Sequence, residues 1–342
     1  MNKNNYFALT KEQQALVLNQ ASAKIGLPPQ AVEKDIWVST ILQIVFSLPF
    51  ADRLIFKGGT SLSKVWGVIN RFSEDIDLAV DRAFFDLEGD LTKRQIKKLR
   101  KESSVFVRSQ FAGELQRKID ELGLSNLCAL EAEPDGEGDG TYPEPRKLFV
   151  RYQSALSNVV SYLQPVVMLE IGSRSLVEPN EECHIQSMLE GQMPSIRTSL
   201  VDADVSTAIP AKTFLEKAFL LHEIFSVEGR GTKAERKSRH LYDLYMMKDK
   251  DFAQAAVNDA ELWESIRHHR EVFTSVQGLD YTPDVRRRLQ LVPRADIIEV
   301  WRKDYEAMKE SMIYGSSPTF EELIAGMTEL QERFRSVSQL NL

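Results

Sequence analysis

The sequence predicts an α+β fold, in which a domain with a mixed sheet at residues 1–205 precedes a mainly α-helical domain at residues 206–342. Two observations predict this division. Short apolar or alternating runs, which are typical of strands, occur in the first part of the chain. From about residue 208 onward, apolar residues recur at helical spacing in five segments, residues 212–225, 233–247, 260–269, 295–308 and 318–334.

Local signals predict the elements of the first domain. Thr10 and Gln13 form a capping-box pattern, which predicts a helix that runs to about residue 25. An apolar stripe predicts a second helix at residues 30–48. The acidic loop at residues 131–145, rich in glycine and proline, is an insertion within this domain. Further elements are expected as strands at residues 53–56, 75–80, 147–154 and 164–172, and as helices at residues 61–69 and 92–122.

The composition excludes several classes of protein. Of the 342 residues, 43% are hydrophobic and 27% are charged, as in soluble globular proteins. The start of the chain lacks the apolar segment of a signal peptide, and no run approaches the ~18 apolar residues of a membrane span. We therefore expect a cytoplasmic protein with no membrane partner. Cys128 and Cys183 are too few for a disulfide framework and lack metal-ligand spacing, which fits a reducing compartment.

The net charge of −7 is not typical of a nucleic-acid-binding protein. Positive charge is nevertheless concentrated in three clusters, at residues 93–101, 230–240 and 286–288. Each cluster is a candidate to bind phosphates. Taken alone, each cluster is better explained as the solvated face of a helix.

Asp75 and Asp77 lie two residues apart on the predicted strand, so both side chains lie on the same face of the sheet. Ile76 and Leu78 then lie on the other face, toward a core. Two convergent carboxylates bind hard divalent cations such as Mg²⁺. A D-x-D pattern alone is weak evidence, because charged residues are also common on solvated strand faces.

A glycine turn precedes these aspartates and consists of Gly58, Gly59, Thr60 and Ser61. Glycines let the backbone approach a ligand, and the free N–H groups at the start of a helix favour anions. In isolation the pattern also fits an ordinary capped turn. It is neither a P-loop nor a dinucleotide fingerprint, because G-x-x-x-x-G-K-[ST] and G-x-G-x-x-G are absent. A phosphate-binding turn that is followed roughly fifteen residues later by D-x-D on a strand is typical of polymerase-β-type nucleotidyltransferases.

The segment from Phe56 to Val80, with GGTSLSK and RFSEDIDL, resembles the AbiEii/AbiGii toxin family of nucleotidyltransferases. The resemblance continues in VEKDIWV at residues 32–38, TFLEKAFLLH at residues 213–222 and RHLYDLYMM at residues 239–247. It implies a polymerase-β-like nucleotidyltransferase domain in the toxin of a bacterial toxin–antitoxin or abortive-infection locus. A cognate antitoxin encoded nearby is then expected as a partner. Some members of the family transfer nucleotides to the 3′ end of tRNA.

With this resemblance, Asp75 and Asp77 are expected to be catalytic and to bind metal. Glu170 lies in an apolar strand, where it is expected to be a third metal-binding carboxylate that accepts the proton of the attacking hydroxyl. The alternative for Glu170 is an ion pair with Arg174. Lys57 and residues 58–61 are expected to bind the nucleotide.

Lys217 lies on the apolar side of its predicted helix, and the resemblance assigns it to the phosphates of the nucleotide. Arg239 and Asp243 are spaced i,i+4, which a surface ion pair would explain. We expect instead that both belong to the nucleotide site and that Asp243 orients Lys217 or Arg239. Residues 33–35 also match the family, and we expect them to support the glycine turn.

The predicted reaction transfers a nucleoside monophosphate from ATP, GTP or CTP to an acceptor hydroxyl and releases pyrophosphate. Two Mg²⁺ (or Mn²⁺) ions held by the aspartates are expected to bind the attacking and leaving oxygens. tRNA is the expected acceptor, and a protein side chain is the second hypothesis. A third hypothesis is a non-catalytic module that binds a nucleotide or a partner. It is disfavoured because such a module has no need of three convergent acids.

Overall fold

The structure, a computed structural model, describes residues 5–136, 142–157 and 163–337. The chain divides into two units. Unit 1 comprises Met1–Val65 and Phe72–Ala208, and unit 2 comprises Trp66–Arg71 and Ile209–Leu342. The sequence predicts a single boundary near residue 205, and this differs from the observed division in one respect. A short segment between the glycine turn and the aspartates groups with unit 2. Part of the predicted acidic loop lies outside the described residues.

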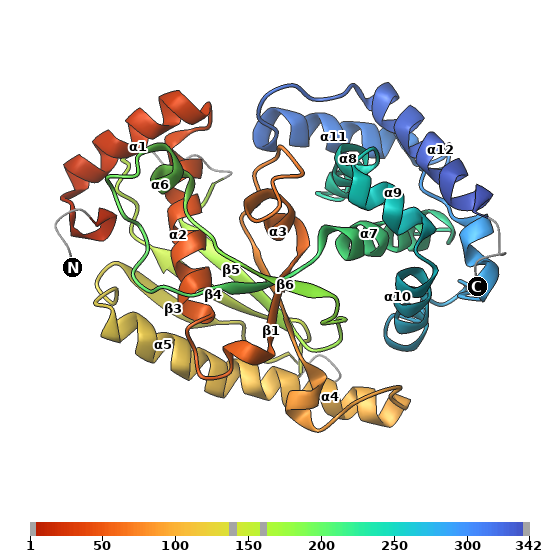
Figure 1. Ribbon diagram of the computed structural model, residues 1–342, viewed down its shortest axis with the longest axis horizontal. Coiled ribbons are helices and arrows are strands. Elements are labelled where there is room, and N and C mark those ends of the chain that lie inside the picture. The colour runs from red at the N-terminus through yellow and green to blue at the C-terminus, as the bar shows by residue number, and fades with distance from the viewer. Residues whose placement is uncertain (1–4, 137–141, 158–162, 338–342) are drawn as a thin grey trace. The chain divides into compact units, whose positions relative to one another are not determined.

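Unit 1 is built on a mixed sheet (Figure 1). Its strands are β1 (Leu54–Lys57), β2 (Ile76–Val80), β3 (Cys128–Ala132), β4 (Arg146–Tyr152), β5 (Val166–Gly172), β6 (Asn180–Cys183) and β7 (Val205–Ala208). Within the described residues these seven strands pair in the order β3-β4-β5-β2-β1-β7-β6. β1 is parallel to β7 and β2 is parallel to β5, whereas the other neighbours are antiparallel. The predicted α+β fold with a mixed sheet is confirmed.

Three of these strands, β3, β6 and β7, are not predicted by the sequence. β3 and β6 are the two edges of the sheet. An edge strand is exposed along one side and needs few apolar residues, so it lacks the alternation by which strands are recognised. β6 has the sequence NEEC, and β7 has only four residues. Cys128 and Cys183 are both free, as predicted.

Most of the helices predicted for unit 1 are present in the structure. Thr10 and Gln13 form the predicted capping box. The helix predicted at residues 92–122 is present, but a π-helical turn interrupts it, and Figure 1 shows its two halves end to end below the sheet. The helices are α1 (Lys11–Ile25), α2 (Pro29–Val45), α3 (Gly58–Lys64), α4 (Lys93–Phe106), α5 (Ala112–Glu121) and α6 (Met188–Gln192), with the π-turn η4 at Val107–Phe111 and 3-10 turns η1 (Tyr6–Ala8), η2 (Ala51–Arg53) and η3 (Arg82–Phe85).

Helix α2 lies at the centre of unit 1. Every residue from Ala31 to Val45 is buried, so this helix is covered on all sides. It packs against β5, α1, α5 and α6. Its burial includes three consecutive charged residues, which must be paired because burying an isolated charge is costly.

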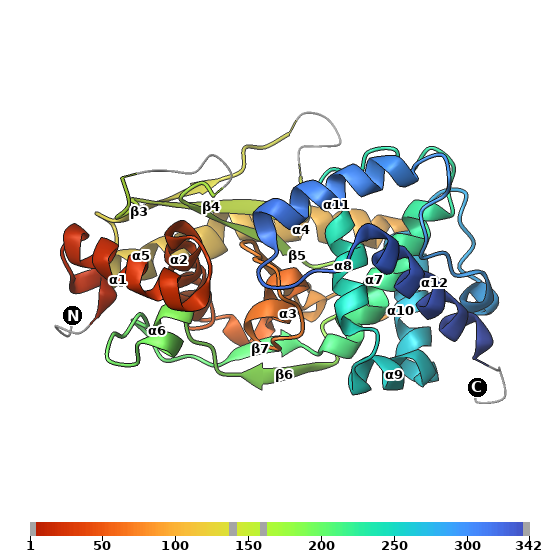
Figure 2. The same ribbon diagram turned by 90° about the horizontal axis from the view of Figure 1, so that it is seen from above.

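Unit 2 is mainly helical, as predicted. Its helices are α7 (Pro210–Phe225), α8 (Ser238–Met247), α9 (Asp251–Asn258), α10 (Ala260–Phe273), α11 (Ile298–Met312) and α12 (Phe320–Ser336), with the 3-10 turn η6 at Pro283–Arg288. The five predicted helices are present, and only the eight-residue α9, too short for a clear period, is not predicted. α7 packs against α8, α9 and α10, and α8 packs against α11 and α12 (Figure 2). No described helix is long and apolar enough to cross a membrane.

Candidate active site

A row of charged residues crosses four strands of unit 1. Lys57 of β1 pairs in register with Asp77 of β2, Asp77 with Glu170 of β5, and Glu170 with Lys147 of β4. Residues that are paired in register present their side chains on the same face of a sheet. The sheet therefore carries two adjacent acids in this row, with a lysine on either side.

Asp75 directly precedes β2, and Asp77 is the second residue of that strand. Both aspartates are half-buried, whereas Ile76 and Leu78 are fully buried. The predicted alternation of half-buried aspartates with buried apolar residues is therefore confirmed. Their role as metal ligands stays a prediction.

Gly58 allows the Asp77 carboxylate to lie against the backbone. Its φ of +82° is in the left-handed region, which favours glycine. A Cβ atom at this position would lie 2.1 Å from Oδ2 of Asp77, so any other residue would displace the carboxylate. α3 begins at Gly58 and ends at Lys64, so the boundaries predicted for this helix, residues 61–69, are wrong.

The hydroxyl groups of the glycine turn are used inside the protein. The buried Thr60 hydroxyl donates to the carbonyl oxygen of Asp75 at 2.5 Å. The buried Ser61 hydroxyl donates to the carbonyl oxygen of Gly58 at 2.9 Å. The first bond ties the turn to the residue that precedes β2. Phosphate binding by residues 58–61 stays a prediction, and it now rests on their backbone N–H groups.

The three buried charges of α2 are all bonded, and two of them, Lys34 and Asp35, are bonded to segments next to this turn. The pairs are Glu33 with Ser154, Lys34 with Glu74, and Asp35 with Lys64. Lys64 is the last residue of α3, and Glu74 directly precedes Asp75. Lys34 and Asp35 therefore hold the two ends of the glycine-turn region, whereas Glu33 binds the segment after β4.

Glu170 is paired with a lysine and not with the arginine that the alternative interpretation named. The Lys147 Nζ lies 3.1 Å from Oε1 of Glu170, and both side chains are about one-third exposed. Arg174 is bonded instead to the buried carboxylate of Glu144. The alternative partner is therefore wrong, because the β4–β5 register places Lys147, and not Arg174, beside Glu170.

In unit 2, the buried Arg71, Lys217 and Asp243 form a polar cluster with the half-buried His240. Arg71 donates to both carboxylate oxygens of Asp243, from Nε at 2.6 Å and from Nη2 at 2.8 Å. The Lys217 Nζ lies 2.9 Å from Oδ2 of Asp243 and 3.4 Å from Nδ1 of His240. The side chains of Arg71, Asp243 and Lys217 are 1%, 0% and 8% exposed, so the two cations share the Asp243 carboxylate as their counter-charge with little help from water.

Burial and neighbouring charges set the protonation of this cluster. Burial lowers the pKa of Lys217, and the nearby Arg71 lowers it further, whereas Asp243 opposes both. Burial alone would raise the pKa of Asp243, but Arg71 and Lys217 outweigh burial and lower it. Burial, Lys217 and Arg239 lower the pKa of His240 well below its usual value. His240 is therefore neutral at pH 7, and its Nδ1 accepts a hydrogen bond from Lys217.

A comparison with protein families decides the identity. Residues 41–326 match the family described as nucleotidyl transferase AbiEii toxin, type IV toxin–antitoxin system. The chain belongs to this family. It is therefore a nucleotidyltransferase toxin of the AbiEii type, as the sequence motifs predict, and membership implies a nucleoside triphosphate substrate, a divalent metal ion and an antitoxin partner.

Other comparisons are less informative. The AbiEii-family chain is similar to the solved structure of the nucleotidyltransferase toxin MenT4 from Mycobacterium tuberculosis H37Rv, at 17% sequence identity and a TM-score of 0.49. The match covers 97% of this chain and 94% of MenT4. No curated protein matches the sequence.

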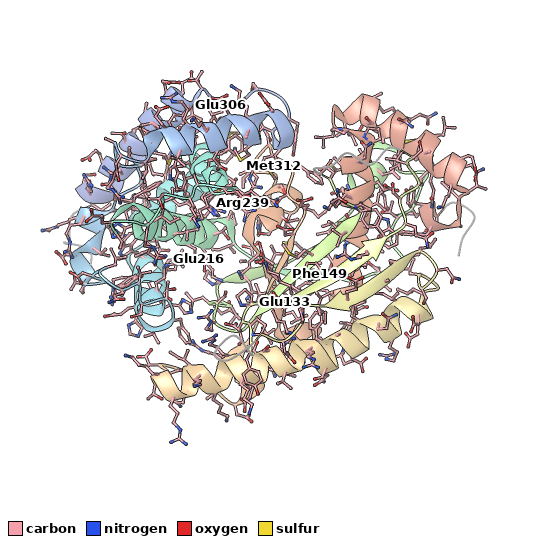
Figure 3. All side chains as sticks on the ribbon, turned by 180° about the vertical axis from the view of Figure 1, so that it is seen from behind. Glu133, Phe149, Glu216, Arg239, Glu306 and Met312 are labelled. Atoms are coloured by element: carbon pink, nitrogen blue, oxygen red, sulfur yellow. The ribbon has the colours of Figure 1, made fainter. Side chains whose placement is uncertain are left out.

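Sequence reasoning missed two members of the AbiEii toxin's buried cluster, Arg71 and His240. Both lie inside blocks that resemble the family, but neither has a spacing that indicates a partner far along the chain. Asp243 contacts Lys217, one of the two partners that the sequence offers for it. Arg239, labelled in Figure 3, is the second residue of the same helix, one turn before Asp243, and is half-buried. Its predicted contact with the nucleotide stays a prediction.

The donor set of unit 1 fits the divalent metal that the AbiEii family implies. No group of three or more His, Cys, Asp or Glu side chains that could hold a metal ion occurs in the part of the chain that the structure describes. Mg²⁺ in nucleotide-dependent enzymes is usually bound by one or two carboxylates together with substrate phosphates and water. Asp75 and Asp77 supply two carboxylates of this kind, and the close approach of Gly58 leaves the Asp77 carboxylate in place beside the turn.

Proposed function

We propose that this AbiEii toxin transfers a nucleoside monophosphate to a hydroxyl of RNA, with the 3′ end of tRNA as the acceptor. The acceptor oxygen forms a bond to the α-phosphorus, the bond from that phosphorus to the bridging α–β oxygen breaks, and pyrophosphate leaves with the electron pair. The proton of the hydroxyl moves to a carboxylate oxygen of Glu170. Membership of the family supports the transfer, and the charge on α4 supports the acceptor. The proposed compartment is the bacterial cytoplasm.

The roles proposed for unit 1 follow the row of charges. Asp75 and Asp77 would hold Mg²⁺ or Mn²⁺, in a pair as in other two-metal enzymes, and the metal would neutralise charge on the attacking and leaving oxygens. Glu170 lies beside Asp77 in the register and has Lys147 on its other side, so its carboxylate is held on the face that carries the aspartates. Lys57 and the backbone of residues 58–61 are assigned to the phosphates. The resemblance adds Lys217 and Arg239 to that set.

Glu170→Gln is expected to lower kcat by about 100-fold, because general base catalysis contributes about 10²–10⁴-fold. The KM for the nucleoside triphosphate should change little, since glutamine keeps the shape and the hydrogen bond with Lys147. Transfer of labelled nucleotide at several substrate concentrations measures both constants.

Glu131→Gln is the matched control for this change. Glu131 also pairs with a basic residue across two strands, at 2.7 Å from Arg151, but it lies on the edge strand β3. It should leave kcat unchanged. If Glu170→Gln has the kcat of the wild type, Glu170 is not the general base of the reaction.

The observation that supports RNA as the acceptor is the exposed basic face of α4. This helix contains six basic residues and one acidic residue, in a protein whose net charge is −7. Lys93, Arg94, Lys97, Lys98 and Lys101 are all exposed, and their spacing places them on one side of the helix. A continuous basic face of this kind suits the phosphates of a nucleic acid, because such contacts dominate its affinity.

The other two basic clusters are less suited to an extended polyanion. In the cluster at residues 286–288, the guanidinium of Arg286 lies 4.4 Å from the ring centroid of Trp263, and Arg288 is paired with Asp280 and Asp284. The cluster at residues 230–240 leads into α8 and includes half-buried residues at its end. The sequence does not separate the three clusters, whereas exposure favours α4, in which Lys98 pairs with Glu102 at 3.6 Å and the other four exposed cations remain exposed.

Neutralising Lys93, Lys97 and Lys101 together with glutamine is expected to weaken binding of tRNA and to flatten its salt dependence. The slope of log affinity against log salt should fall by about two units, since each lost phosphate contact contributes about 0.7–0.9. The KM for the nucleoside triphosphate should stay unchanged. Fluorescence anisotropy of labelled tRNA over a range of salt concentrations measures the slope.

A variant with Arg230, Lys233 and Arg236 changed to glutamine removes the same charge from an exposed stretch of another cluster. It should keep most of the wild-type slope. An unchanged slope in the α4 variant would show that α4 is only a solvated face. Labelled product that resists RNase and migrates with protein would replace the RNA acceptor by a protein side chain.

A further inference from the structure

The segment Trp66–Arg71 joins the glycine-turn helix to the strand with the aspartates, yet it groups with the helices of unit 2. Two backbone contacts anchor it there. The N–H of Tyr314 donates to the carbonyl oxygen of Asn70 at 3.2 Å, and Arg71 forms a β-bridge with Ile313. The segment ends at Arg71, which lies four residues before Asp75 in the sequence.

Arg71 determines how Asp243 is presented to Lys217. Its Nε and Nη2 bind the two different oxygens of the carboxylate, so the carboxylate plane is fixed by a planar fork. The Lys217 Nζ contacts one of those oxygens, Oδ2, at 2.9 Å. A single donor such as lysine at position 71 would leave the carboxylate able to turn about its bond and to offer both oxygens to Lys217.

The Lys217 ammonium has one donor left for a ligand. It carries three N–H groups, and in the described part of the chain two acceptors are recorded for it, Asp243 Oδ2 and His240 Nδ1. Both acceptors are fixed, Asp243 by Arg71 and His240 by its place on the same helix. The direction of the third N–H group is therefore determined by the first two.

We propose that Arg71 is a positioning residue that, through Asp243, orients the Lys217 ammonium for a phosphate of the nucleoside triphosphate. This inference rests on the proposed role of Lys217. Arg71 itself touches no substrate in the proposal. It acts by fixing the carboxylate, and its positive charge also limits how strongly that carboxylate holds the ammonium.

The proposal can be tested through the pKa of Lys217, which depends on the charged and titratable groups around it. A purely structural role of Arg71 would leave this pKa unchanged. The groups around Lys217 are Asp243, Arg239 and His240 of α8 and Arg71 of the anchored segment. Arg71→Gln removes one positive charge near Lys217. Lys217 is then the only cation of the cluster that binds the Asp243 carboxylate. Both changes favour the protonated amine, so the pKa of Lys217 should rise by about one pH unit.

The experiment measures the titration of Lys217 directly, by NMR of the full-length protein labelled with ¹³C at lysine Cε. The Lys217 signal is assigned from its absence in Lys217→Arg. Arg71→Gln is expected to move the midpoint of that signal up by about one pH unit and to raise the KM for the nucleoside triphosphate. Arg71→Lys keeps the charge and loses the fork, so it should raise the KM with a smaller change in the midpoint.

Arg270→Gln is the matched control. Arg270 forms a similar two-pronged contact with a buried carboxylate of unit 2, Glu223, at 2.6 and 2.5 Å, and it is not among the main charges that shift the pKa of Lys217. It should lower stability without moving the Lys217 midpoint. An unmoved midpoint and an unchanged KM in folded Arg71→Gln and Arg71→Lys would overturn the role of Arg71. A moved midpoint with a wild-type KM would instead show that Lys217 does not bind the nucleotide, which contradicts the proposed function at that residue.

Discussion

Asp77→Asn is expected to reduce nucleotide transfer by at least about 1,000-fold and to remove any toxicity. Asparagine keeps the size of the side chain that lies against Gly58 but loses the charge that would bind a divalent cation. A bound metal contributes several kcal/mol to phosphoryl transfer, and about 4 kcal/mol corresponds to 1,000-fold in rate. Asp75→Asn should have an effect of similar size. Transfer of labelled nucleotide, together with growth of cells that express each variant, measures both outcomes.

The fold should survive these changes. Both aspartates are half-buried, and the buried Ile76 between them is untouched. Loss of one of two neighbouring like charges removes repulsion in the metal-free protein. Circular dichroism and the unfolding midpoint of both variants should therefore match the wild type. Full activity in either variant would rule out the proposed metal site.

Gly58→Ala tests the same site without changing its charge. The added Cβ would meet the Asp77 carboxylate, and a displacement of about 1 Å costs about 100-fold in activity. Gly26→Ala is the control for backbone strain, because its φ is +79° but no atom lies within 4 Å of the added Cβ. Both variants bear the strain, and only Gly58→Ala should lose transfer activity.

Much of the fold can be predicted from the sequence, because most long elements carry a clear period. The alternation of β2 and the apolar stripes of α7 and α12 are examples, and each is present where it is predicted. Elements without such a period escape prediction. β6 is an exposed edge with two glutamates, and α9 has eight residues. The predicted start of α3 is also wrong. Glycines indicate a turn in the sequence, but here they form the first turn of the helix.

The site is predicted less completely, because pairing between distant residues leaves no local pattern. Asp77 and Glu170 are both predicted, but their register, and the lysine beside Glu170, follow only from strand pairing. For Asp243 the nearest charge in sequence is a poor guide. Arg239 is four residues away, whereas the residue that binds both of its oxygens, Arg71, is 172 residues away.

Asp243→Asn is expected to destabilise unit 2 by about 3–5 kcal/mol, because it leaves two buried cations without a counter-charge. Arg71 is 1% exposed and Lys217 is 8% exposed, so water does not replace the lost carboxylate. Denaturant unfolding followed by circular dichroism measures the loss, as a fall in the midpoint of the transition. A difference below about 1 kcal/mol would show that the cluster is more hydrated than its burial indicates.

The pH dependence of this difference follows from the lowered pKa of Asp243. A carboxyl group whose pKa is lower in the folded state stabilises the fold above its ordinary pKa of about 3.9, and this contribution is lost as pH falls through the folded-state value. The difference between the wild type and Asp243→Asn should therefore stay constant from pH 7 down to about pH 4 and shrink only below that.

A triple variant, Arg71→Met, Asp243→Leu and Lys217→Met, separates the structural role of the cluster from its function. Buried ion pairs are often replaced by apolar residues of similar volume at no cost, or with a gain of 1–4 kcal/mol, because the desolvation penalty disappears. The triple variant should therefore recover most of the stability that Asp243→Asn loses. It should still lack transfer activity, since the ammonium and the fork that orients it are gone. A triple variant that is both stable and active would show that the charges of this cluster are needed neither for stability nor for transfer.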